Sequence, residues 1–168
     1  MKFKQNASMY IRNFIFGVED SLVSTVGLLS GIAITNMSGS KIITTGIILI
    51  FVEAFSMSIG SLLSEHSVEE YENHKNVSFW NAALGALTMF FAYFIFGFAP
   101  LLPYVFAPLN YAFWISIIFS LIVLFLVGSL SSKFLGARAL RNGFEMLGLG
   151  GVAIVVGVII GRLANSVF

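Results

Sequence analysis

A chain of 168 residues that is 58% hydrophobic and only 10% charged cannot be an ordinary water-soluble domain, because charged residues make up roughly a quarter of such domains. Together with a mean hydropathy of +0.94, this composition predicts an integral membrane protein surrounded by lipids, with no nucleic-acid partner. The formal net charge is only +1, and the absence of cysteine excludes disulfides and thiolate metal sites.

Five apolar segments follow one another along the chain, and each has the roughly 20 residues that a bilayer-spanning helix needs. We predict spans at residues 13–35, 42–64, 77–98, 111–130 and 143–163, within a single transmembrane domain covering residues 1–168. The expected fold is therefore an all-α bundle of five transmembrane helices. Residues 36–40 form a predicted turn, and a stretch containing Pro100, Pro103 and Pro108 is expected to separate the third span from the fourth.

The distribution of lysine and arginine predicts the orientation of these spans. Short loops rich in positive charge stay on the cytoplasmic side of a membrane, so we expect the N-terminus in the cytoplasm and the C-terminus outside. The predicted cytoplasmic set is Lys2, Lys4, Arg12, Lys75, Lys133, Arg138 and Arg141, against Lys41 and Arg162 on the opposite side.

A short acidic segment, residues 65–75, is then predicted to continue the second helix into the cytoplasm. It carries Glu65, Glu69 and Glu72 at offsets of four and seven, with His66 and His74 close by. These side chains can gather hydrated cations at the mouth of a pathway. The alternative is a solvated helix end, because acids beyond a membrane helix have that simpler explanation.

Three acidic residues, Glu19, Asp20 and Glu53, lie inside the predicted spans without an intramembrane Lys or Arg. A carboxylate in the hydrocarbon layer costs several kcal/mol, so it normally faces the bundle interior and marks an ion path, a proton relay or a pairing partner. These acids therefore call for a bound cation or for protonation. The alternative is an interfacial position with a capping role, above all for Glu19, which is turned about 100° from Asp20.

Helical spacing places these acids on two stripes of neighbouring residues. On the second helix, Glu53 and Met57 lie one turn apart, and a carboxylate combined with a thioether favours Fe²⁺ or Mn²⁺ over Mg²⁺ and Ca²⁺. Ordinary packing is the alternative for Met57. The first helix carries Asp20, Ser24, Gly27 and Gly31 along one small, polar stripe. The pattern Gly27-x-x-x-Gly31, like Gly157-x-x-x-Gly161 in the last helix, favours close contact between helices.

These motifs resemble those of the vacuolar iron transporter family, which are small five-helix carriers of Fe²⁺ and Mn²⁺. Residues 19–25, Glu-Asp-Ser-Leu-Val-Ser-Thr, are similar to the family's first-helix pattern Asn-Asp-Gly-x-Val-Ser-Thr. Residues 56–60, Ser-Met-Ser-Ile-Gly, resemble its second-helix pattern Ser-Met-Ala-x-Gly, and Arg141-Asn142-Gly143 fits the start of its glycine-rich last helix. The resemblance implies a homodimer whose protomers form the pathway between them, with Asp20 and Met57 lining it and metal leaving the cytoplasm in exchange for protons.

The chain departs from the family pattern in two places. The family's Gly-Glu-Tyr after the methionine is Gly60-Ser61-Leu62 here, and Glu53, one turn before Met57, can replace the missing acid. The cytoplasmic metal-binding insert of plant and protist members is absent. We therefore expect a short, prokaryotic-type member in a plasma membrane, with a vacuolar or other organelle membrane as the alternative.

The expected function is transport of a divalent metal, Fe²⁺ or Mn²⁺, with protons as the coupling ion and no bound cofactor. The expected metal ligands are Asp20, Glu53 and Met57, and the secondary pathway residues are Glu19, Ser24, Glu65, Glu69, Glu72 and His66. We expect no enzymatic activity, because the chain has no Walker-type phosphate loop, His-Glu-x-x-His motif or nucleophile elbow. A proton-coupled exporter of organic cations and a membrane scaffold are the alternatives.

Overall fold

The computed structural model describes residues 2–35, 37–73, 79–135 and 138–167, and nearly all of them are helical. Five helices follow in chain order, and every one of them is long and apolar enough to cross a membrane. This confirms the predicted all-α fold of five transmembrane helices. The helices are α1 (Lys2–Ala33), α2 (Gly39–Asn73), α3 (Phe79–Phe106), α4 (Leu109–Leu135) and α5 (Ala139–Val167).

The second helix continues beyond residue 64, where the predicted span ends. It runs without a break through the acidic segment to Asn73, as predicted, because this segment contains good helix formers such as glutamate and no glycine or proline. His74 and Lys75 lie outside the described residues. The extension therefore projects as part of α2 and does not form a separate loop.

The end of the third helix differs from the prediction. Pro100 and Pro103 lie inside α3, which continues to Phe106, whereas the sequence analysis placed both prolines in the connection. A proline removes one intrahelical hydrogen bond and usually ends a helix, but membrane helices tolerate it where neighbouring helices supply contacts. Here the Ser116 hydroxyl of α4 donates a hydrogen bond of 2.7 Å to the Pro100 carbonyl. Only Pro108 lies in the connection between α3 and α4.

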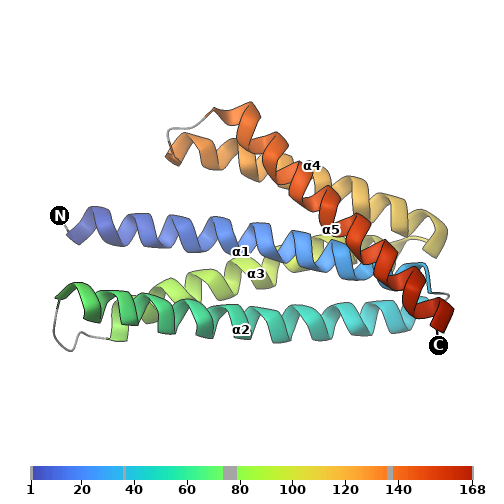
Figure 1. The fold of residues 1–168 in the computed structure, drawn as a ribbon, viewed down its shortest axis with the longest axis horizontal. Coiled ribbons are helices and arrows are strands. Elements are labelled where there is room, and N and C mark those ends of the chain that lie inside the picture. The colour runs from blue at the N-terminus through green and yellow to red at the C-terminus, as the bar shows by residue number, and fades with distance from the viewer. Residues whose placement is uncertain (1, 36, 74–78, 136–137, 168) are drawn as a thin grey trace.

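The helices form a bundle in which α3 is shared by its neighbours. Both α1 and α2 pack extensively on α3 but contact each other much less, and α4 and α5 form a second closely packed pair. The α4–α5 pair lies across α1 and α3, and the two chain ends lie at opposite ends of the molecule (Figure 1), as an odd number of spans requires. The most buried helix is α1, so its side chains form the centre of the bundle.

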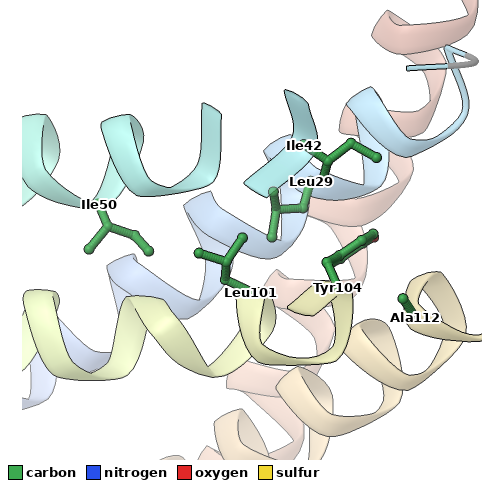
Figure 2. Close-up of a cluster of buried hydrophobic side chains, with 6 residues drawn as sticks. All are labelled: Leu29, Ile42, Ile50, Leu101, Tyr104 and Ala112. Atoms are coloured by element: carbon green, nitrogen blue, oxygen red, sulfur yellow. The ribbon is translucent and has the colours of Figure 1, made fainter. Parts of the chain in front are cut away.

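Buried apolar side chains connect the helices in two clusters. One cluster joins α1, α2, α3 and α4 near the end of α1, and its side chains point towards one another (Figure 2). Its members are Leu29, Ile42, Ile50, Leu101, Tyr104 and Ala112. The other joins α1, α3 and α4 through Val18, Leu22, Ala92 and Leu124. Most other large apolar side chains point outwards, as expected for surfaces that face lipid.

The glycines of α1 and α5 form a close helix crossing. A Cβ atom added at Gly31 would lie 2.6 Å from the Gly157 carbonyl oxygen. One added at Gly157 or Gly161 would overlap the carbonyl oxygens of Gly27 or Gly31, respectively. The two Gly-x-x-x-Gly patterns therefore pack against each other backbone to backbone, which confirms the predicted role of both patterns. We call this contact the glycine crossing.

Candidate functional site

The three intramembrane acids lie in the middle of two antiparallel helices. Glu19 and Asp20 are in α1 and Glu53 is in α2, and all three side chains are half-buried. Asp20 is close enough to Glu53 for their negative charges to repel each other, and Glu19 interacts in the same way with Asp20. The fold thus brings together acids that lie far apart in the sequence. Among the described residues, none of the three acids forms an ion pair with a basic side chain.

A tyrosine of the third helix completes this group. The Tyr93 side chain is 0% exposed, and its hydroxyl lies 2.6 Å from the Ser24 hydroxyl of α1, one turn beyond Asp20. The Tyr93 hydroxyl also lies in the neighbourhood of the Asp20 and Glu53 carboxylates. Two carboxylates and two hydroxyls from three helices therefore form one polar group inside the bundle. We call Asp20, Glu53, Ser24 and Tyr93 the carboxylate site.

Tyr93 is the residue of this site that the sequence did not predict. It lies in the run 89–99, Met-Phe-Phe-Ala-Tyr-Phe-Ile-Phe-Gly-Phe-Ala, where an aromatic side chain reads as packing. One feature of the sequence distinguishes Tyr93 from its neighbours: its hydroxyl is the only polar side-chain group in this run. A buried hydroxyl in hydrocarbon needs a hydrogen-bond partner, and that partner is the predicted pathway residue Ser24.

In the part of the chain that the structure describes, few donor groups for a metal ion lie together. Met57 is half-buried one turn beyond Glu53 on α2. Among the residues that the structure describes, no three His, Cys, Asp or Glu side chains gather closely enough to hold a metal ion. The carboxylate site alone therefore offers two carboxylate groups and neutral hydroxyls. Carboxylate and hydroxyl oxygens suit hard or borderline divalent cations.

The acidic extension of α2 is engaged in local contacts. Glu65 forms an ion pair with Arg12 of α1, in which the Glu65 side chain is 16% exposed and that of Arg12 66%. The His66 ring packs on Phe79 with a centroid distance of 4.8 Å, and its Nδ1 atom is 3.9 Å from the Glu70 carboxylate. These residues therefore join one end of α2 to neighbouring parts of α1 and α3.

The remaining acids of the extension also take part in interactions. Glu69 is half-buried and Glu72 is exposed, and both have interacting neighbours. The predicted spacing of Glu65, Glu69 and Glu72 along one helix is present, because α2 includes all three residues. Their role in gathering metal ions stays a prediction.

Comparison with known proteins agrees with the motifs of α1 and α2. A sequence model of the VIT family matches residues 11–79 and 72–162, two segments that together include parts of all five helices. The segments overlap at residues 72–79, at the connection between α2 and α3. The chain is also 26% identical over 207 aligned positions to Vacuolar iron transporter 1 of Arabidopsis thaliana, an alignment that covers 88% of this chain and 83% of that protein. Because the matched residues make up most of the sequence and include the carboxylate site, this chain belongs to the VIT family.

Proposed function

We propose that the protein is a membrane transporter of divalent transition metals that exports Fe²⁺ or Mn²⁺ from the cytoplasm in exchange for protons. Membership of the VIT family and the similarity to a protein named as an iron transporter support metal transport. They favour it over the export of organic cations and over a scaffold role. The observation that carries the proposal is the proximity of Asp20 and Glu53, without a basic partner among the described residues.

Two neighbouring carboxylates in a membrane bundle need positive charge to stabilise them. The low dielectric disfavours both ionised forms, and the two negative charges also repel each other. A divalent cation bound between the carboxylates removes both penalties, and so do protons. Metal ions and protons therefore compete for Asp20 and Glu53, and this competition provides a mechanism for antiport.

The choice of metal follows from the donor atoms within reach. Asp20 and Glu53 provide carboxylate oxygens, Ser24 and Tyr93 provide neutral hydroxyl oxygens, and Met57 lies one turn beyond Glu53. Oxygen ligands with an added thioether favour Fe²⁺ or Mn²⁺ over Mg²⁺. We therefore propose Asp20, Glu53 and Met57 as the metal ligands.

A second copy of the chain is proposed to complete the ligand set. Mn²⁺ and similar ions take about six ligands in oxygen-rich sites, whereas the carboxylate site of one chain, within the described residues, contains the carboxylates of Asp20 and Glu53. The α2 helix is far less buried than α1, and Glu53 is half-exposed in the single chain. A two-fold axis beside α2 would supply the same residues again from the partner. The proposed pathway therefore lies at a homodimer interface.

Transport into proteoliposomes with an acidic interior tests this proposal, because protons leaving the vesicle would drive metal uptake. We expect uptake of Fe²⁺ or Mn²⁺ by the wild type, with Co²⁺, Zn²⁺ and Mg²⁺ measured alongside at two pH values. Asp20→Asn and Glu53→Gln should each lower metal uptake at least about tenfold. Glu145→Gln is the matched control, because Glu145 is an exposed acid paired with Arg141 at the start of α5.

The outcomes separate the function from its site. Undiminished uptake in both the Asp20 and the Glu53 variants would contradict the site. A wild-type protein that transports none of the five metals would contradict the function. Uptake that does not respond to the pH gradient would contradict the coupling to protons but leave metal transport standing.

A further inference from the structure

The two carboxylates of the site are carried by helices that contact each other little. Both α1 and α2 instead pack along α3 (Figure 1). The distance between Asp20 and Glu53 is therefore set by the way in which each helix lies on α3. A residue of α3 that fixes one of these contacts also determines the spacing of the carboxylates.

Close contacts of α1 and α2 with α3 lie on either side of Tyr93 in the sequence. On one side, α1 approaches so closely that a Cβ atom added at Gly17 would lie 3.0 Å from the Ala92 Cβ. On the other side, a Cβ atom added at Gly97 would lie 3.0 Å from Cγ1 of Ile50 in α2. Tyr93 thus lies where α3 touches both helices of the site.

The Tyr93 hydroxyl is the polar part of this contact. Its 2.6 Å hydrogen bond with Ser24 joins α3 to α1 one turn from Asp20. The side chain is fully buried, so water cannot replace the bond, and its loss would leave a buried hydroxyl without a partner. The bond therefore favours one position of α1 on α3 over its neighbours.

We propose that Tyr93 is a positioning residue, whose hydrogen bond with Ser24 fixes α1 on α3 and thereby sets the spacing of Asp20 from Glu53 that selects the transported ion. This inference rests on the proposed function. Selectivity among divalent cations depends on the size and rigidity of the ligand cage, and the larger Ca²⁺ needs longer bonds than smaller divalent ions. A carboxylate spacing that is held fixed excludes Ca²⁺, whereas a spacing that can relax admits it.

Removal of the hydroxyl alone tests the proposal. Tyr93→Phe keeps the buried ring and deletes the hydrogen bond, and Ser24→Ala deletes the same bond from the other side. In proteoliposomes, each variant should raise the KM for Fe²⁺ about fivefold, as expected for one lost hydrogen bond. The preference for Fe²⁺ over Ca²⁺ should fall by a similar factor, while the maximal rate changes less than about twofold.

Three further variants test whether the hydrogen bond between Tyr93 and Ser24 is the cause. The double variant should match the single variants, because all three lack the same interaction. Ser24→Thr retains a hydroxyl, so its KM for Fe²⁺ should equal that of the wild type. Tyr104→Phe is the matched control, since Tyr104 is also a buried tyrosine of α3 but belongs to the apolar cluster shown in Figure 2.

Several results would overturn the inference. An unchanged KM and ion preference in Tyr93→Phe, or an equal effect of Tyr104→Phe, would show that the hydroxyl does not position the site. Additive effects of the two single variants would show that they act separately. If Tyr93→Phe does not fold, the inference is tested on Ser24→Ala and Ser24→Thr instead, by the same KM for Fe²⁺ and the same preference for Fe²⁺ over Ca²⁺.

The failure of this inference can be told apart from the failure of the proposed function. Wild-type uptake of Fe²⁺ that is lost in Asp20→Asn but unchanged in Tyr93→Phe would overturn the inference alone. A wild-type protein that neither transports nor binds Fe²⁺ would overturn the proposed function and this inference with it.

Discussion

The first helix carries two neighbouring stretches that lie on the same face but are built differently. In the first stretch, the Asp20 carboxylate repels that of Glu53 in α2, and the Ser24 hydroxyl forms a hydrogen bond with Tyr93 of α3. At Gly27 and Gly31, α1 presents backbone without a side chain, and the backbone of α5 lies directly against it. The carboxylate site therefore joins helices through polar side chains, whereas the glycine crossing joins them backbone to backbone.

This difference shows how stability and function are divided along α1. The glycine crossing holds α5 on α1 by close backbone contact, so that any added atom must push the helices apart. The carboxylate site contributes repulsion between like charges, which destabilises the bundle unless a cation or protons are bound. Substitutions in the two stretches should consequently have opposite effects on folding and on transport.

The largest expected effect is a loss of the folded protein when a side chain is added at the glycine crossing. Gly157→Ala places a methyl group on the Gly27 carbonyl, and such overpacking costs about 1–3 kcal/mol or more. Gly151→Ala is the control on the same helix, because a Cβ atom there meets nothing within 4 Å. Thermal unfolding of the detergent-solubilised protein measures both, and equal stability of the two variants would show that the crossing is not tight.

The carboxylate site should respond in the opposite way. Asp20→Asn removes the charge that repels both Glu19 and Glu53, so the melting temperature of the metal-free protein should stay the same or rise, while metal uptake falls at least about tenfold. The same thermal assay, performed in the presence of a chelator, provides the measurement. A marked loss of stability would mean that Asp20 serves packing, as the glycines do.

A smaller effect is expected from the thioether beside the site. Met57→Leu keeps the apolar volume but removes the sulfur, so uptake of Fe²⁺ relative to Mn²⁺ should fall about two- to threefold, because sulfur favours the softer ion. Met37→Leu is the control, since Met37 is an exposed methionine just before the start of α2. An unchanged ratio of the two metals in Met57→Leu would assign Met57 to packing.

The smallest effect concerns the ion pair between α1 and the extension of α2. Arg12→Gln should lower stability by only about 0.2–1 kcal/mol, because the Arg12 side chain is mostly exposed and salt screens such pairs. Thermal unfolding at low and high salt tests this, with Arg141→Gln as a second, exposed pair for comparison. A large loss that persists at high salt would make this ion pair a structural element comparable to the glycine crossing.

The helices and the acids of the site could be predicted from the sequence because each has a local signal. Apolar stretches of sufficient length define membrane spans, and Asp20 and Glu53 are conspicuous in such stretches. The continuation of α2 to Asn73 followed from helix-forming residues. The glycine patterns predicted close contacts, but not that α5 is the partner of α1, because the pattern describes one helix surface only.

The features that could not be predicted depend on contacts between residues that lie far apart in the sequence. Pro100 and Pro103 are typical helix breakers, and the sequence alone does not show that α3 continues through them to Phe106 and packs on α4. Tyr93 looked like one aromatic residue among many until the fold placed its hydroxyl beside Ser24. The proximity of Asp20 to Glu53 likewise follows from the way in which α1 and α2 lie on α3, which no local pattern records.

The most direct test of the central claim is the position of a bound metal ion. Anomalous scattering from crystals of the purified protein grown with Mn²⁺ would locate it. We predict an anomalous peak between α1 and α2, within bonding distance of carboxylate oxygens of both Asp20 and Glu53. A metal peak found only along the acidic extension of α2, with none at Asp20, would contradict it.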